Sequence, residues 1–398
     1  MAKPLLPALL VALMSMAPAA EPLDAPRRSL AQSPPAPLAV AGAGASFPGV
    51  VLRDAARAYA PVAPGVAVTY AAVGSGRGLC RAKGHASSCS AGDVVQPTEV
   101  DFACSEALLS DADYASFPDL QMYPVVAGAA VMVYNLPGQE GSGALVLNAT
   151  TLAGVFSGAV TRWDDSAIAE LNPGAALPAE RIRVAVRDDK SGTTEVWTKA
   201  LSMMDASFAS RVAPSAAPDW SAVPGAERRD TGFGVASYVL ATPYSAGYCA
   251  LGDSNALGLQ VADFLHAGAA APVRASPESI AEAVLERGLM FGNNGDPPSR
   301  LTADVMGATG AAAWPAVSYS YAVLRTGVPD DRLREGATCA HVEATLAFWD
   351  WFLTSEVVES VARQHGFAVP PPLVRLVVHA RIVTDVHCGG EPVQQAQA

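Results

Sequence analysis

Residues 187–194 read Arg-Asp-Asp-Lys-Ser-Gly-Thr-Thr and stand between an apolar run at 182–186 and the helical pattern Glu195, Val196, Ala200, Leu201 and Met204. This order predicts a strand that ends in a cation, turns through hydroxyl groups and a glycine, and opens a helix. The first turn of a helix offers unpaired N–H groups and the positive end of the helix dipole to an anion, and Arg187 can add two parallel hydrogen bonds. Ser-Gly-Thr is also ordinary capping sequence, so this stretch alone leaves both interpretations open.

Three more segments of the same kind favour anion binding. They are 42–48 (Gly-Ala-Gly-Ala-Ser-Phe-Pro), 74–78 (Gly-Ser-Gly-Arg-Gly) and 100–106 (Val-Asp-Phe-Ala-Cys-Ser-Glu). We expect each to join a strand to a helix. Strand-like runs at 66–70, 125–134, 182–186 and 318–324 alternate with helical patterns, which predicts an α/β fold with parallel sheets. Four such loops can meet at one anion only if two lobes face each other across a cleft.

Composition limits the classes of function. The chain has 398 residues, of which 51% are hydrophobic and 16% charged, so it has enough core material for two ordinary domains. Its formal net charge of −12 argues against nucleic-acid binding, which needs a basic surface. A small anion is still an eligible ligand, because its capture depends on local donors. We also expect a monomer.

The N-terminus has the pattern of an export signal. Lys3, an apolar stretch and small residues predict a signal peptide at 1–20, since this run is shorter than a membrane-spanning helix requires. A Pro-rich linker at 21–40 follows. The apolar run 124–136 is too short to span a membrane and predicts a buried strand. We therefore expect an exported protein, periplasmic or at the cell surface, with no transmembrane segment in the mature chain.

Six cysteines fit an oxidising compartment, although their number alone permits many pairings. A Cys80–Cys89 disulfide would close a short Gly/Ser-rich insertion, and a Cys339–Cys388 disulfide would tie back the C-terminal segment. Cys104 and Cys249 stand in apolar sequence, which favours small buried residues. The sequon at Asn148 permits glycosylation if the source is eukaryotic.

The chain resembles a known family, the phosphate-binding proteins of bacterial ABC phosphate importers, which have the type II periplasmic-binding-protein fold. The matching segments are 42–48, 74–76, 100–106, 161–174 and 187–194, with weaker matches at 232–248, 313–315 and 349–366. The resemblance implies an α/β protein with two lobes, a cleft and two hinge crossovers. Lobe 1 would comprise 41–124 plus 316–398, lobe 2 would comprise 125–315, and the crossovers would lie near 122–125 and 315–318.

The resemblance also implies a set of phosphate ligands. The expected hydroxyl and N–H donors come from both lobes, with Arg187 as the charge partner; they are Ser46, Phe47, Ser75, Arg187, Ser191, Gly192 and Thr193. Asp189 matches the carboxylate that orients the arginine. Gly76 and Arg77 are additional candidates. Arg77 departs from the small residue usual in the family, and it either reaches the anion or lies on the surface.

Glu106 stands where the family has an aspartate. A carboxylate in an anion site distinguishes ligands by their protons, because monohydrogen phosphate has a hydrogen to donate and sulfate at neutral pH has none. Glutamate keeps the acceptor but is one methylene longer. Phosphate is therefore the expected ligand, with altered affinity or a preference for arsenate or a phosphonate as alternatives. Glu106 could also simply cap the next helix.

Two other functions compete with phosphate import. A phosphate-ester hydrolase would need a nucleophile with a base, or a metal cluster, and the six histidines lie outside the four anion loops. Cys104 has no identifiable histidine partner, and Asp164 and Asp165 resemble an ordinary helix start. We expect no catalysis, metal or cofactor. The second alternative is a secreted receptor that works without an ABC permease.

Overall fold

The main sheet has ten strands, and eight of them follow the order β2-β1-β3-β11-β4-β8-β6-β7, with β9 and β13 also paired to β4. The computed structural model describes residues 36–84, 100–139, 143–328, 333–334 and 336–393. Residues Pro37–Ala398 form one compact unit. The expected signal peptide and most of the expected linker lie outside the described residues.

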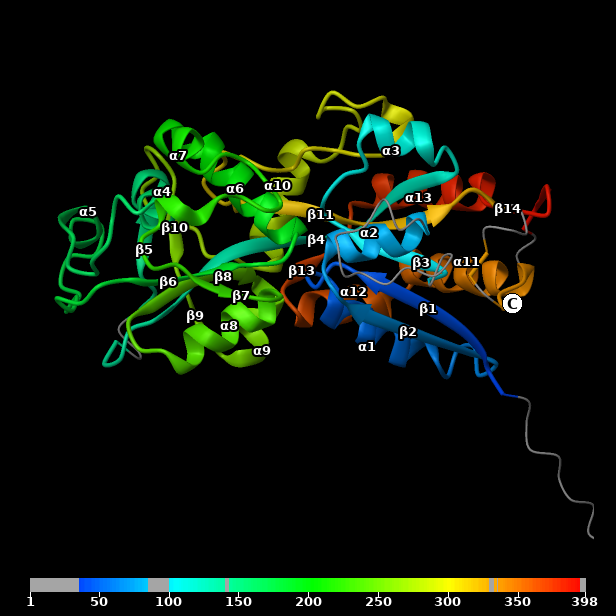
Figure 1. The fold of residues 1–398 in the computed structure, drawn as a ribbon, viewed down its shortest axis with the longest axis horizontal. Coiled ribbons are helices and arrows are strands. Elements are labelled where there is room, and N and C mark those ends of the chain that lie inside the picture. The colour runs from blue at the N-terminus through cyan, green and yellow to red at the C-terminus, as the bar shows by residue number, and fades with distance from the viewer. Residues whose placement is uncertain (1–35, 85–99, 140–142, 329–332, 335, 394–398) are drawn as a thin grey trace, which may run out of the picture. The chain divides into compact units, whose positions relative to one another are not determined.

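The strands within the described ranges are numbered along the chain (Figure 1). They are β1 Leu38–Gly44, β2 Val66–Ala72, β3 Phe102–Ser105, β4 Leu120–Asn135, β5 Val146–Asn148, β6 Arg183–Arg187, β7 Glu227–Arg229, β8 Ser245–Ala250, β9 Gln260–Val261, β10 Asp263–Leu265, β11 Val317–Arg325, β12 Gly327–Val328, β13 Phe367–Ala368, β14 His387–Cys388 and β15 Glu391–Pro392.

The α-helices and short 3-10 helices of the described ranges connect these strands. The α-helices are α1 Gly49–Tyr59, α2 Ser75–Lys83, α3 Asp111–Ser116, α4 Ala149–Ser157, α5 Ser166–Ala169, α6 Gly192–Met204, α7 Ala206–Arg211, α8 Gly232–Ala241, α9 Leu251–Leu257, α10 Pro277–Arg287, α11 Cys339–Thr354, α12 Glu356–Gln364 and α13 Pro372–Asp385. The 3-10 helices are η2 Trp220–Ala222 and η3 Pro298–Arg300. No helix in these ranges is both long and apolar enough to cross a membrane.

Strand β4 determines how the sheet is organised. Its residues 120–129 pair with β11, and its residues 130–135 pair with β8 (Figure 1). One parallel group, β1 to β3, runs in the direction of β4, because both β3 and β4 are antiparallel to β11. The other parallel group, β6 to β8, runs against β4. The carboxyl ends of the two groups therefore point toward each other, which is where α/β proteins place their ligand sites.

Most of the elements expected from the sequence are present. Helices α1 and α6 begin where the patterns placed them, and β2, β4 and β11 cover three of the expected strands. The fourth, β6, is shifted by one residue from the expected run 182–186. The expected parallel strands are present in the two groups, but β4 and β11 at the centre of the sheet are antiparallel to each other, which the sequence did not indicate. These two strands carry the chain between the parallel groups, so they run in opposite directions.

The segment 100–106 also differs from expectation, because it does not open a helix. Strand β3 ends at Ser105, and α3 begins only at Asp111. The side chain of Ser110 caps α3 by accepting from the N–H of Asp113. Glu106 is therefore not a helix cap, whereas Asp165 does cap α5, as its sequence context indicated.

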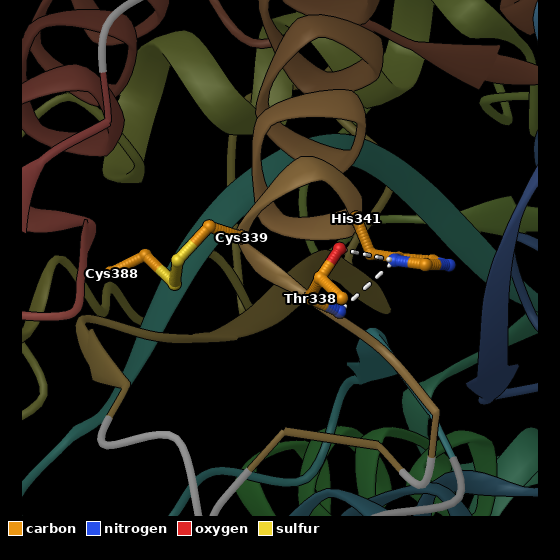
Figure 2. Close-up of a disulfide and its surroundings, with 4 residues drawn as sticks. All are labelled: Thr338, Cys339, His341 and Cys388. Carbon is orange, nitrogen blue, oxygen red and sulfur yellow. Dashed lines mark hydrogen bonds between the residues drawn. A yellow bond between two sulfur atoms is a disulfide. The ribbon is translucent and has the colours of Figure 1, made fainter.

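The predicted disulfide between Cys339 and Cys388 is confirmed (Figure 2). It joins the first residue of α11 to the short strand β14. Beside it, His341 Nδ1 accepts from the N–H of Thr338, which caps α11. Cys104 and Cys249 are free and buried, as expected. The proposed partner of Cys80, Cys89, lies outside the described residues.

Replacing either Cys339 or Cys388 with Ser should lower the free energy of unfolding by about 2–4 kcal/mol, because the open chain regains the entropy that a 49-residue closure removes. Urea unfolding followed by tryptophan fluorescence measures this change. The double Ser variant is the control, and its stability should match that of the single variants to within about 0.5 kcal/mol. Additive losses would show that the two cysteines act separately.

Candidate functional site

Arg187 is the last residue of β6. Its guanidinium is buried, and two of its three nitrogens bond to Asp189. Its Nε and Nη2 each donate to Asp189 at 2.6 Å, and the two side chains are only 1% and 5% exposed. Burial would raise the pKa of Asp189, but the hydrogen bonds and charge of Arg187 outweigh it and hold the pKa below its usual value. Arg187 Nη1 has no partner within the described part of the chain. The ion pair thus fixes the guanidinium and leaves Nη1 for a ligand.

Helix α6 begins at Gly192, five residues after Arg187, the last residue of the strand. The Ser191 hydroxyl accepts from the N–H of Thr194 at 3.1 Å, so it keeps its own hydrogen for donation. Gly192 and Thr193 occupy the first turn, whose N–H groups have no intrahelical acceptors. Ser191 and Thr193 are both buried. The strand-to-helix turn thus has the chemistry of an anion site, as the sequence predicted.

Tyr248 on β8 holds the strand end and the helix start together. Its hydroxyl accepts from the N–H of Arg187 at 3.2 Å and also bonds with the Thr194 hydroxyl at 2.7 Å. Its ring stacks on Trp197 of α6, with centroids 5.7 Å apart. Rigid packing of this kind keeps donors in place before a ligand arrives.

Glu106 lies directly after β3, buried between two hydroxyl groups. Ser75 Oγ donates to its Oε2 at 3.1 Å, and Ser320 Oγ on β11 donates to its Oε1 at 2.6 Å. Burial raises the pKa of Glu106 to about 7, against the opposing effects of Ser320, Ser75 and the more distant charge of Arg187. The carboxyl can therefore be either charged or protonated near neutral pH.

Two close approaches bring the parallel groups together at this point. A Cβ atom on Gly192 would lie 2.5 Å from Ser75 Oγ and 2.8 Å from Glu106 Oε2, so only glycine fits without displacing them. Gly74, at a φ of +95°, faces Asp189, whose Oδ2 would be 2.8 Å from an added Cβ. The loops after β2, β3 and β6 thus meet around Glu106 and the ion pair.

Ser46 and Phe47 lie at the same edge of the sheet, between β1 and α1. The Tyr70 hydroxyl holds this turn by donating to the carbonyl of Ala45 at 2.8 Å. Phe47 is buried, and its ring packs edge-on against Phe367. Gly44 pairs with Cys104, which places Ser46 beside the end of β3 and hence on the side of Glu106. Ser46 is half-buried.

The two additional candidates are placed differently. Gly76 packs against the side chain of Lys190, with an added Cβ 3.1 Å from Lys190 Cβ. Arg77 is exposed, and its Nη1 donates to the carbonyl of Val73 at 3.4 Å. Neither geometry tests a role in ligand binding, so both remain predictions from the sequence.

Residues 31–356 match the model of the PBP superfamily domain. The chain belongs to the PBP superfamily. This match covers both parallel strand groups and every residue of the candidate site. It agrees with the resemblance that the loop motifs indicated.

Curated relatives and solved structures of this superfamily are named for phosphate. The phosphate-binding protein PstS of Xylella fastidiosa (strain 9a5c) is 29% identical over 339 residues, which cover 85% of this chain and 83% of that protein. The phosphate-binding protein of Stenotrophomonas maltophilia has a TM-score of 0.62 at 20% identity, covering 86% of this chain and 93% of the other. The periplasmic phosphate-binding protein PfluDING, solved with phosphate, has a TM-score of 0.63 at 18% identity and covers 88% and 99%. These structures establish the type II periplasmic-binding-protein fold for this superfamily member.

Sequence reasoning missed three residues that the fold brings to the site. Ser320 donates to Glu106, Tyr248 braces Arg187, and Asp253 lies buried near Arg187. Ser320 lies within a strand that the sequence did predict, but alternation of residues does not reveal which hydroxyl faces a distant carboxyl. Asp253 lies beyond the last matched segment of its region, and no short motif marks it.

The pKa of Glu106 predicts a pH dependence of stability for the ligand-free protein. Because the folded pKa of about 7 exceeds the ordinary 4.5, the stabilisation is complete below about pH 4.5 and is lost as pH rises through 7. Glu106→Gln should reduce the fall in unfolding free energy between pH 4.5 and 8 by up to about 3 kcal/mol. Urea unfolding at several pH values tests this. The exposed Glu282→Gln serves as control; equal pH profiles for wild type and Glu106→Gln would contradict the prediction.

Proposed function

We propose that the protein binds inorganic phosphate, as monohydrogen phosphate, outside the cytoplasm and without catalysis. The observation that carries this proposal is the buried guanidinium of Arg187, whose Nη1 has no partner among the described residues. It lies beside a helix start, and a carboxyl that titrates near neutral pH faces the same place. A cation, N–H donors and one proton acceptor together match a protonated oxyanion. The names of the relatives support the same ligand.

The residues expected to bind phosphate supply one positive charge, several hydrogen-bond donors and one acceptor. Arg187 supplies the positive charge, and Asp189 holds it in position. Glu106 accepts the hydrogen of the ligand. The hydroxyl and N–H donors are Ser46, Phe47, Ser75, Ser191, Gly192 and Thr193, with Ser75 giving its N–H while its hydroxyl donates to Glu106.

Non-catalytic binding is supported by the chemistry around Glu106. Burial, together with the nearby charge of Glu106, raises the pKa of the Cys104 thiol well above its ordinary value. A protonated, fully buried thiol is a poor nucleophile. The buried hydroxyls of Ser75 and Ser320 both donate to Glu106, which makes them supports for a carboxyl.

The setting of this activity is also part of the proposal. The signal-like N-terminus and the PstS relatives support export and delivery of phosphate to an ABC permease. We propose that lobes 41–124 plus 316–398 and 125–315 close around the anion through crossovers near 122–125 and 315–318. Both crossovers fall at or within β4 and β11, the two strands that carry the chain between the parallel groups.

Arg187→Ala should weaken phosphate binding by about 3 kcal/mol or more, which is about 100-fold in Kd, because the buried anion loses its countercharge. Isothermal titration calorimetry measures the change, and circular dichroism verifies folding. Arg228→Ala is a matched control, since that arginine is half exposed and pairs with Asp188. Unchanged affinity in Arg187→Ala would refute the assigned role.

Glu106→Gln should raise the affinity for sulfate relative to phosphate by about tenfold or more, because a charge-assisted bond to the ligand hydrogen is lost. Competition calorimetry with phosphate, arsenate, sulfate and molybdate reports this ratio and the ligand preference. Glu282→Gln should leave the ratio unchanged. If the ratio of sulfate affinity to phosphate affinity is the same in wild type and Glu106→Gln, Glu106 does not distinguish ligands by their proton.

A further inference from the structure

A second buried carboxyl, that of Asp253, lies near Arg187 Nη1, the guanidinium nitrogen that does not bond to Asp189. Asp253 lies in the first turn of α9, is 5% exposed, and its Oδ2 has no hydrogen-bond partner among the described residues. A Cβ added to Gly232 would lie 2.4 Å from this Oδ2 and 3.8 Å from Arg187 Nη1. The two unpartnered atoms therefore both lie close to the same glycine.

One ligand oxygen can bridge these two atoms only if they are too far apart to bond to each other directly. No ion pair within 4.0 Å joins Arg187 to Asp253 among the described contacts, although both approach Gly232. An oxygen that accepts from Nη1 and donates its hydrogen to Oδ2 would make bonds of about 2.6–2.9 Å on each side. A bare oxyanion oxygen would instead be repelled by an ionised Asp253.

The groups around Asp253 do not neutralise it. The charge of Arg187, at the end of β6, lowers the pKa of Asp253, and so does the charge of Arg53 on α1, whose side chain is exposed. On β8 the neighbouring titratable group is the Cys249 thiol, whose pKa is raised by burial and by the charge of Asp253. From the α12–β13 turn the backbone carbonyl of His365 approaches Gly252, while the His365 ring bonds to Asp54. Burial raises the pKa of Asp253 to about 7 despite the two arginines.

We propose that Asp253 is a second proton acceptor for the ligand, so that the site recognises an oxyanion that can present two hydrogens. This inference rests on the proposed phosphate function. The bound complex then holds two protons among the phosphate, Glu106 and Asp253. Dihydrogen phosphate with two carboxylates satisfies this count, and so does monohydrogen phosphate with one protonated carboxyl. Sulfate would meet two carboxylates with no hydrogen to give, which strengthens its exclusion.

The proposal predicts proton uptake on binding at alkaline pH. At pH 8.5 the free carboxyls are ionised and phosphate carries one hydrogen, so the complex must take about one proton from solution. The affinity of the wild type should then fall about tenfold per pH unit above pH 8. Asp253→Asn should bind with no net uptake, and its affinity should change by less than about threefold between pH 8 and 9.

Calorimetric titration of the full chain with inorganic phosphate, in two buffers of different ionisation enthalpy, counts these protons. Asp188→Asn is the matched control, because it removes one exposed carboxylate next to Arg187 and should retain the uptake. Should Asp253→Asn fail to fold, Asp253→Ser replaces it with the same expectation. Wild-type binding with no uptake at pH 8.5, or undiminished uptake without Asp253, overturns the inference and leaves the proposed function intact. Absence of phosphate binding by the wild type at pH 7 overturns both.

Discussion

The continuous course of β4 through both parallel strand groups is the constraint on which the site depends. Nine of its first ten residues pair with β11, with a bulge at Val125, and its last six pair with β8. Because the second group runs against β4 and the first runs along it, the strand ends of both groups converge. Loops far apart in sequence, at Ser75, Glu106 and Gly192, therefore come within contact distance. A strand with a different direction at this position would turn one set of loops away.

The converging loops bury more charge than a folded core ordinarily tolerates. Asp189 neutralises Arg187, but the carboxyls of Glu106 and Asp253 have no cation bonded to them, and burial raises the pKa of each to about 7. Unpaired buried charges destabilise a fold, so these groups are costly unless a ligand or proton compensates them. The site is thus arranged for an anion that brings hydrogens, and the same feature ties ligand binding to pH.

The sequence predicted the local parts of this arrangement well. Hydroxyl and glycine residues after apolar runs indicated the starts of α1, α2 and α6, since capping chemistry is local. The loop before Leu108 was misjudged, because β3 ends without a helix and Ser110 caps the next one. The antiparallel pairing at the centre of the sheet was also missed. The apolar pattern of a buried strand does not reveal the direction in which the strand runs.

The sequence by itself determined three of the four strand-to-helix loops, the cation at the end of β6 and, through resemblance, the family. These depend on neighbouring residues or on motifs that can be read in order. The sequence also suggested the Cys339–Cys388 pair, which the structure decided among the possible pairings. Only the tertiary structure decided that Ser320 supports Glu106 and that Asp253 faces the free edge of Arg187. Such pairings join residues separated by tens to hundreds of positions, and strand order rather than local preference brings them together.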